Sequence, residues 1–216
     1  MPLRLLGIFP GLEDAVSLSG GTLARCADSG IETMVVSLTS GDRGTDRVSR
    51  AARLLGVSQL VRFDFNEVFD AAEGDSIRKA ISDLMRSFQP DVVVEAGDAG
   101  SGTNAVQAAI AAAFQQAWLA GSGPARLYWS TRPGDLRCTT VSDVRSQLQR
   151  KLDAISVLAA ESAAAYLASN ADHRGHLMDR EFYVRAHPRP WVTGIVERDL
   201  FAGLLERPAS VLSVAA

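Results

Sequence analysis

Two adjacent carboxylates, Glu13 and Asp14, are the first residues of the chain whose types and spacing could do chemistry. They follow an apolar run that ends at Pro10-Gly11 and precede a helical pattern, so they stand where a strand passes into a helix. Paired carboxylates can hold separated pKa values and so share general acid and general base work. The alternative is structural, because acids in the first turn of a helix are stabilised by the helix dipole, by about 0.3–1 kcal/mol each.

A second set of polar residues could bind a substrate. Arg43 and Arg47 could bind an anionic or polyhydroxylated ligand, or they could be ordinary surface residues of an arginine-rich chain. Four hydroxyl, amide and acidic residues gather before an Ala-rich helical stretch: Asp98, Ser101, Thr103 and Asn104. Such groups can hold a substrate at the start of a helix, or they can simply cap it.

Metal-binding residue types are scarce. The chain has three histidines, His173, His176 and His187, so a metal site formed by earlier residues must do without imidazole. The segment 172–176 (DHRGH) could be a ligand cluster or an exposed polar loop. The two cysteines, Cys26 and Cys138, lack CxxC spacing and are interpreted as reduced thiols.

The pattern of apolar residues predicts alternating strands and helices. Strands are expected at Leu3–Phe9, Thr33–Leu38, Leu60–Phe65, Asp91–Glu95 and Arg126–Ser130, and helices at Ala15–Ser29, Asp46–Leu55, Ser76–Phe88, Asn104–Leu119 and Arg145–Ala168. The tail from Ala171 is expected to be loop-like. This alternation predicts an α/β, Rossmann-like fold with a mostly parallel sheet and helices on both faces. With 216 residues and no internal repeat or long linker, residues 1–216 are expected to form a single domain.

Ligands of such sheets bind beyond the carboxyl ends of the strands. Those ends fall at residues 9–14, 39–45, 63–67 and 96–104, and three of the four segments mix glycine with acids or amides. Neither GxGxxG after the first strand nor GxxxxGK[ST] is present, which disfavours dinucleotide and P-loop sites. The candidate site residues therefore gather at one edge of the predicted sheet.

Several motifs follow one another in an order that resembles the PIG-L/LmbE family of zinc-dependent N-deacetylases. They are PGLEDAV at 10–16, GGTLA at 20–24, TSGDRG at 39–44, AARLLGV at 51–57, PDVVV at 90–94, RLYW at 126–129 and ERDLFAGL at 197–204. The first two resemble the PHLDDAV…GGTLA branch of the family. The resemblance implies the family's Rossmann-like deacetylase fold and a pocket at the Glu13 and Asp14 edge.

The resemblance also implies that this chain has lost the family's metal ligands. In the family, the motif His and second Asp bind zinc, the first Asp is the general base, and a later His completes the site. The corresponding residues here are Gly11, Asp14, Glu13 and Thr103. Because catalytic zinc needs three protein ligands and an open position, we expect no metal and no cofactor at this place.

Three functional hypotheses remain open. The first is a metal-independent enzyme that acts on a small polar amino-sugar-like molecule or a natural-product intermediate. Its catalytic residues would be Glu13 and Asp14, with Gly11 and the polar residues named above lining the substrate site. The second is a non-catalytic pseudoenzyme that binds a ligand or a partner, and the third is a zinc-dependent N-deacetylase with a rebuilt metal site drawing on His173 or His176.

Composition narrows the partners and the location. The net charge of −3 argues against nucleic-acid binding, and no apolar stretch approaches the ~20 residues of a membrane span. The first residues do not resemble a secretory signal. We therefore expect a cytoplasmic protein with a small-molecule substrate, no nucleic-acid or membrane partner, and an oligomeric state, such as a homo-oligomer, that the sequence leaves open.

Overall fold

The computed structural model describes residues 2–39, 45–65, 71–97, 103–121, 123–131, 133–158, 179–188 and 196–204. The strands are β1 (Arg4–Phe9), β2 (Glu32–Ser37), β3 (Gln59–Arg62), β4 (Val92–Ala96), β5 (Arg126–Thr131), β6 (Thr140–Asp143) and β7 (Arg180–His187). The helices are α1 (Leu12–Asp28), α2 (Thr45–Leu54), α3 (Ala71–Phe88), α4 (Thr103–Leu119) and α5 (Leu148–Leu158), with a 3-10 turn, η1 (Arg145–Gln147), before the last.

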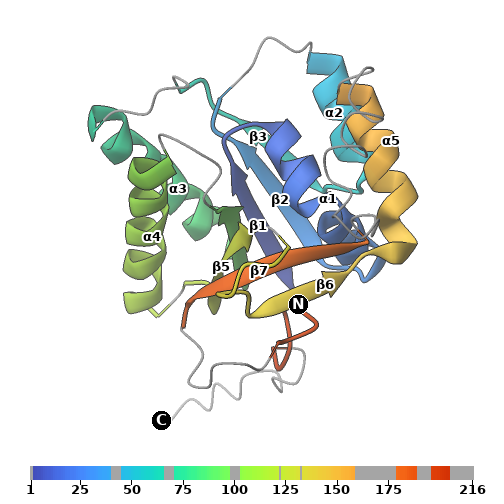
Figure 1. Ribbon diagram of the computed structural model, residues 1–216. Coiled ribbons are helices and arrows are strands. Elements are labelled where there is room, and N and C mark those ends of the chain that lie inside the picture. The colour runs from blue at the N-terminus through green and yellow to red at the C-terminus, as the bar shows by residue number, and fades with distance from the viewer. Residues whose placement is uncertain are drawn as a thin grey trace, which may run out of the picture.

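One seven-stranded sheet runs through the middle of the molecule in the order β3-β2-β1-β4-β5-β7-β6 (Figure 1). The first five strands in this order pair in parallel, whereas β7 pairs antiparallel with both β5 and β6. Helices α3 and α4 cover one face, and α1, α2 and α5 cover the other (Figure 1). The predicted Rossmann-like, mostly parallel sheet with helices on both faces is confirmed.

Each face of the sheet has its own hydrophobic core. Along β1, Leu5 packs in the core under α1, α2 and α5, and its neighbour Leu6 packs in the core under α3 and α4. Strand β4 divides in the same way, since Val92 and Val94 face the first core and Val93 the second. A parallel strand covered on both faces needs apolar residues at every position, which is why these strands are continuous apolar runs.

The C-terminal part of the chain departs from the prediction. The tail that was expected to be loop-like contains β7, which pairs with β5, and the short strand β6 was missed. Charged residues at Glu181 and Arg185 conceal β7, yet Glu181 is buried and Arg185 pairs with Glu197 at 3.0 Å. The predicted helix over 145–168 begins with η1 and continues as α5, and residues 159–168 lie outside the described residues.

Candidate functional site at the switch point of the sheet

The sheet reverses its winding between β1 and β4. From β1 the chain proceeds to β2 and β3 on one side, and from β4 it proceeds to β5 on the other, so the segments that follow β1 and β4 diverge. Such a switch point opens a crevice at the carboxyl ends of the strands, where ligands of this fold class bind. A hollow of about 270 Å³, its open mouth included, lies there, lined by Ile8, Pro10, Leu38, Glu95, Ala96, Val106, Gln107 and Ile110.

The Glu13 and Asp14 carboxylates lie beside this crevice, in the first turn of α1. Gly11 is the extended residue before the helix (φ −130°, ψ 169°), and its N–H donates to Asp14 Oδ2 at 3.0 Å. A Cβ atom on Gly11 would lie 3.1 Å from Glu13 Oε2 and 3.5 Å from Asp14 Oδ2. The two carboxylates therefore flank the space that a side chain at residue 11 would occupy.

The environment of Asp14 favours its protonated form. Desolvation by burial raises the pKa of Asp14, the hydrogen bond from Gly11 N–H opposes this rise, and the charge of Glu13 adds to it. Glu13 and Asp14 are both only partly buried. The capping hydrogen bond thus accompanies two carboxyl groups that solvent can still reach, so the structural interpretation of the pair does not exclude the catalytic one.

The other predicted site residues are described unevenly. Arg47 lies on an exposed part of α2, and no described contact joins it to Glu13 or Asp14. Thr103 and Asn104 are the first residues of α4, but their side chains lie outside the described part of the chain. Arg43, Asp98 and Ser101 lie wholly outside it. The structure therefore brings Gly11, Glu13 and Asp14 together and does not test the rest.

The described donor atoms do not form the family's zinc site. No group of three His, Cys, Asp or Glu side chains that could hold an ion occurs within the described ranges. At the switch point, residue 11 has no side-chain donor, which leaves Asp14 and its neighbour Glu13. His187 lies in β7 against the rings of Phe114 and Trp118, at 5.1 and 4.9 Å between centroids. His173 and His176 lie outside the described residues.

Glu95 is the residue of this site that sequence reasoning missed. It is the fourth residue of β4, lines the hollow and is 1% exposed. The sequence shows it only as an acid at the end of an otherwise apolar strand, VVVE. An acidic residue at the carboxyl end of a buried strand is a signal that could have found it.

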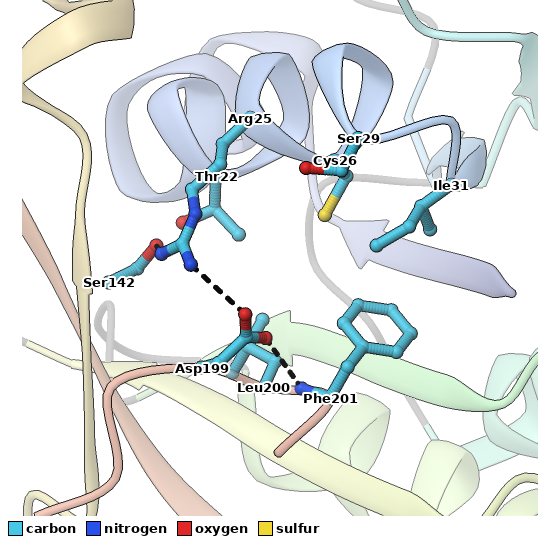
Figure 2. A pocket seen from close by; sticks show the side chains of 9 residues that line it. All are labelled: Thr22, Arg25, Cys26, Ser29, Ile31, Ser142, Asp199, Leu200 and Phe201. Atoms are coloured by element: carbon cyan, nitrogen blue, oxygen red, sulfur yellow. Dashed lines mark hydrogen bonds and ion pairs between the residues drawn. The ribbon is translucent and has the colours of Figure 1, made fainter. Parts of the chain in front are cut away.

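A second hollow lies near the C-terminal end of α1, away from these carboxyl groups (Figure 2). The Arg25 guanidinium in its wall pairs with Asp199 at 3.0 Å, as Figure 2 shows, so its charge is compensated. Burial, together with the nearby Asp199, raises the pKa of the Cys26 thiol to about 12, which leaves the thiol protonated and unreactive. This hollow therefore offers neither a free charge nor a nucleophile.

No helix in the part of the chain that the structure describes combines the length and the apolar character that crossing a membrane requires.

Comparisons with known proteins agree with the arrangement at the switch point. Over 106 residues the chain is 27% identical to diacetylchitobiose deacetylase of Thermococcus kodakarensis, a match that covers 42% of this chain and 39% of that relative. The chain thus aligns with well under half the length of this relative.

Solved structures share the fold. A conserved protein of Thermus thermophilus superposes with a TM-score of 0.69 at 21% identity, covering 88% of this chain and 97% of that one. The 4-carboxy-2-hydroxymuconate hydratase GalB of Pseudomonas putida gives 0.69 at 20% identity (87% and 98% covered). The N,N'-diacetylchitobiose deacetylase of Pyrococcus horikoshii gives 0.61 at 16% identity (88% and 87% covered). At these identities the likeness shows the fold alone.

The family model described as GlcNAc-PI de-N-acetylase matches residues 6–114, about half of the chain. This match includes β1, the Glu13 and Asp14 turn, the switch point and most of α4. The chain belongs to the PIG-L family.

Proposed function

We propose that this PIG-L protein is an enzyme that works without zinc on a small polar molecule, an amino-sugar-like compound or a natural-product intermediate. Glu13 acts as the general base or acid, and Asp14 is its electrostatic partner or anchors the substrate. The deacetylases among its relatives favour attack of water on an N-acyl group as the reaction. The observation that carries the proposal is the glycine at residue 11, where the family has a metal-binding histidine.

The geometry around Gly11 supports this proposal. Its missing side chain leaves space within about 3.5 Å of both carboxyl groups, room for a water molecule or a substrate group in place of an imidazole. Neighbouring carboxyl groups whose environments separate their pKa values can act as an acid and a base. Burial and the Glu13 charge raise the pKa of Asp14, so Asp14 is the member of the pair that holds a proton more readily.

The variant Glu13→Gln tests the base. We expect it to fold normally and to lose about 10²–10⁴-fold in turnover, because the amide keeps the shape of the side chain but cannot accept a proton. The assay measures release of free amine from N-acetylglucosamine, N,N'-diacetylchitobiose and a panel of related N-acyl amino sugars. Asp75→Asn, on the exposed side of α3, is the matched control. Wild-type turnover in the Glu13→Gln variant would refute the catalytic role.

Chelation tests the absence of zinc. After exhaustive treatment with EDTA and dipicolinate, we expect wild-type turnover to remain unchanged and elemental analysis to find less than about a tenth of an equivalent of zinc. Loss of turnover on chelation, with recovery on adding zinc, would instead establish a deacetylase with a rebuilt metal site. An absence of turnover in wild-type protein across the substrate panel, together with retained ligand binding, would favour the pseudoenzyme.

A further inference from the structure

The Glu95 side chain is a buried carboxyl group without a hydrogen-bond partner among the described residues. It is 1% exposed, and neither of its oxygens meets a donor in hydrogen-bonding geometry within that part of the chain. An unsatisfied buried polar group costs about 1–3 kcal/mol, more when it is charged. Native proteins keep few such groups, and each one calls for an explanation, of which a functional role or an unseen partner are the usual ones.

Glu95 lies on the sheet between two neighbours that fix its position. In the strand register it stands opposite Ile8 of β1 on one side and opposite Trp129 of β5 on the other. The Trp129 indole N–H is also buried and lacks a partner of its own in the described structure. The nearby Gln107 Nε2 donates instead to the Ala96 carbonyl at 3.2 Å, so this group is already engaged.

Burial favours the neutral acid. Desolvation raises the pKa of Glu95 well above its usual range, and the Trp129 N–H, which favours the ionised form, only partly opposes this rise. A protonated carboxyl group has one O–H donor besides its acceptor oxygen. With Trp129 N–H on the side of the acceptor oxygen, the O–H remains for a group in the hollow.

The rest of the hollow selects the chemistry of that group. Its other walls are mostly aliphatic, from Ile8, Leu38, Val106 and Ile110. An ammonium ion or a second hydroxyl would leave unsatisfied donors against such walls, whereas a carbonyl oxygen only accepts and the methyl group beside it is apolar. At about 270 Å³ with its mouth, the hollow is smaller than the ~300–1,000 Å³ of pockets that enclose whole ligands, so it fits one group of a ligand.

We propose that the Glu95 carboxyl group is a substrate-binding residue of the switch-point crevice, which donates a hydrogen bond to the carbonyl oxygen of a short acyl group, such as acetyl, whose alkyl end packs against the aliphatic walls. The inference rests on the proposed function for the remainder of the substrate, since Glu13 and Asp14 lie beside the same crevice. Glu95 binds the acyl group and takes no part in proton transfer.

Binding of small acyl probes to three proteins tests this inference. The probes are acetamide and N-acetylglucosamine, with glucosamine as the control that lacks the acyl group. Saturation-transfer NMR of the acetyl methyl and the ¹³C shift of the Glu95 carboxyl measure binding in the millimolar range expected of such small ligands. In wild-type protein we expect both acetyl probes to contact the site and to shift the Glu95 carboxyl signal, and glucosamine to do neither.

Two Glu95 variants separate hydrogen bonding from shape. Glu95→Gln keeps a neutral donor and is expected to bind the acyl probes within about threefold of wild type, whereas Glu95→Met keeps the length without a donor and is expected to bind about tenfold more weakly. Equal binding by Glu95→Met and wild type would overturn the inference. So would a crystal structure at saturating acetamide in which Glu95 contacts an ordered water only.

The Glu13→Gln variant distinguishes this inference from the proposed function. It is expected to bind the acyl probes as wild type does, because Glu13 is not part of the acyl-binding hollow. Normal turnover in Glu13→Gln with intact acyl binding would therefore contradict the proposed function alone. Loss of turnover in Glu13→Gln, combined with unchanged probe binding in Glu95→Met, would contradict the acyl site alone.

Discussion

At the scale of single residues, three carboxyl groups at one crevice stand in different environments. Glu13 and Asp14 remain partly exposed at the start of α1, while Glu95 is enclosed between β1, β5 and α4. Burial is the main cause of the raised pKa at both Asp14 and Glu95. Chemically similar side chains thereby acquire separate tasks from where they lie, as in other sites that use several carboxyl groups.

Glu95 makes the stability of the protein depend on pH. Because its folded-state pKa is raised, its contribution is most favourable below the unfolded value of about 4.5 and is lost as the pH rises toward the folded value. We therefore expect Glu95→Gln to be more stable than wild type by about 1–3 kcal/mol above this range and similar to it near pH 4. Urea unfolding from pH 4 to 9 measures the difference. A difference that stays constant across this range would show that Glu95 does not titrate as described.

The sequence could predict only part of the site at this scale. Gly11, Glu13 and Asp14 stand in a recognisable motif between a strand and a helix, so their proximity follows from local order along the chain. Glu95 stands in no motif. Its importance arises from Trp129 and Ile8 on neighbouring strands, and such neighbours are known only once the strand order is known.

At the scale of elements, β7 explains why two glycines lie in the middle of α1. The Glu181 carboxylate accepts the N–H groups of Gly21 and Thr22 at 2.9 and 2.7 Å, and Lys151 Nζ donates to it at 2.7 Å. A Cβ atom on Gly21 would lie 2.5 Å from the Cβ of Val144. The GGT motif thus lets α1 approach the segment before α5 and the carboxylate on β7 closely enough for these contacts.

The Lys151–Glu181 ion pair is fully buried, so removing one partner is expected to be severe. We expect Lys151→Met to lower the free energy of unfolding by about 3–5 kcal/mol, because Glu181 would be left as a buried charge without its cation. Combining it with Glu181→Met should recover part of this loss. Equilibrium urea unfolding gives both values.

The chain offers a matched control for this experiment, since Lys79 and Lys151 are its two lysines. Lys79 pairs with Asp83 at 3.1 Å on the exposed side of α3. Lys79→Met is expected to change the stability by less than about 1 kcal/mol, the usual contribution of an exposed pair. Similar losses in Lys79→Met and Lys151→Met would contradict the distinction between the two environments.

The elements also show where sequence patterns succeed and fail. The parallel strands and their helices follow from apolar runs and helical periodicity, and their observed bounds lie within a few residues of the predicted ones, apart from the earlier starts of α1 and α3 and the earlier end of β3. Strand β7 has Arg180, Glu181 and Arg185 among its eight residues, so its pattern resembles a polar loop. Only the partners of Glu181 and Arg185 in the folded structure make this segment a sheet strand.

At the scale of the whole molecule, β7 joins distant parts of the chain. It lies between β5 and β6 in the sheet and contacts α1 through Glu181. A chain that ends at Leu158 is therefore expected not to fold, because β6 would lose its partner strand and Lys151 would lose its carboxylate. Circular dichroism and proteolysis of that truncated chain test this expectation, and a cooperative unfolding transition in it would contradict the role assigned to β7.

The hydrogen bond between Gly21 and Glu181 spans 160 residues of sequence. During synthesis, α1 leaves the ribosome long before β7 exists, and closing so long a loop is slow. The nascent chain thus carries an incomplete core, with Lys151 awaiting its partner, until nearly the whole chain has been translated. Chaperones and proteases meet this intermediate, so the yield of folded protein in the cell depends on how quickly the last strand arrives.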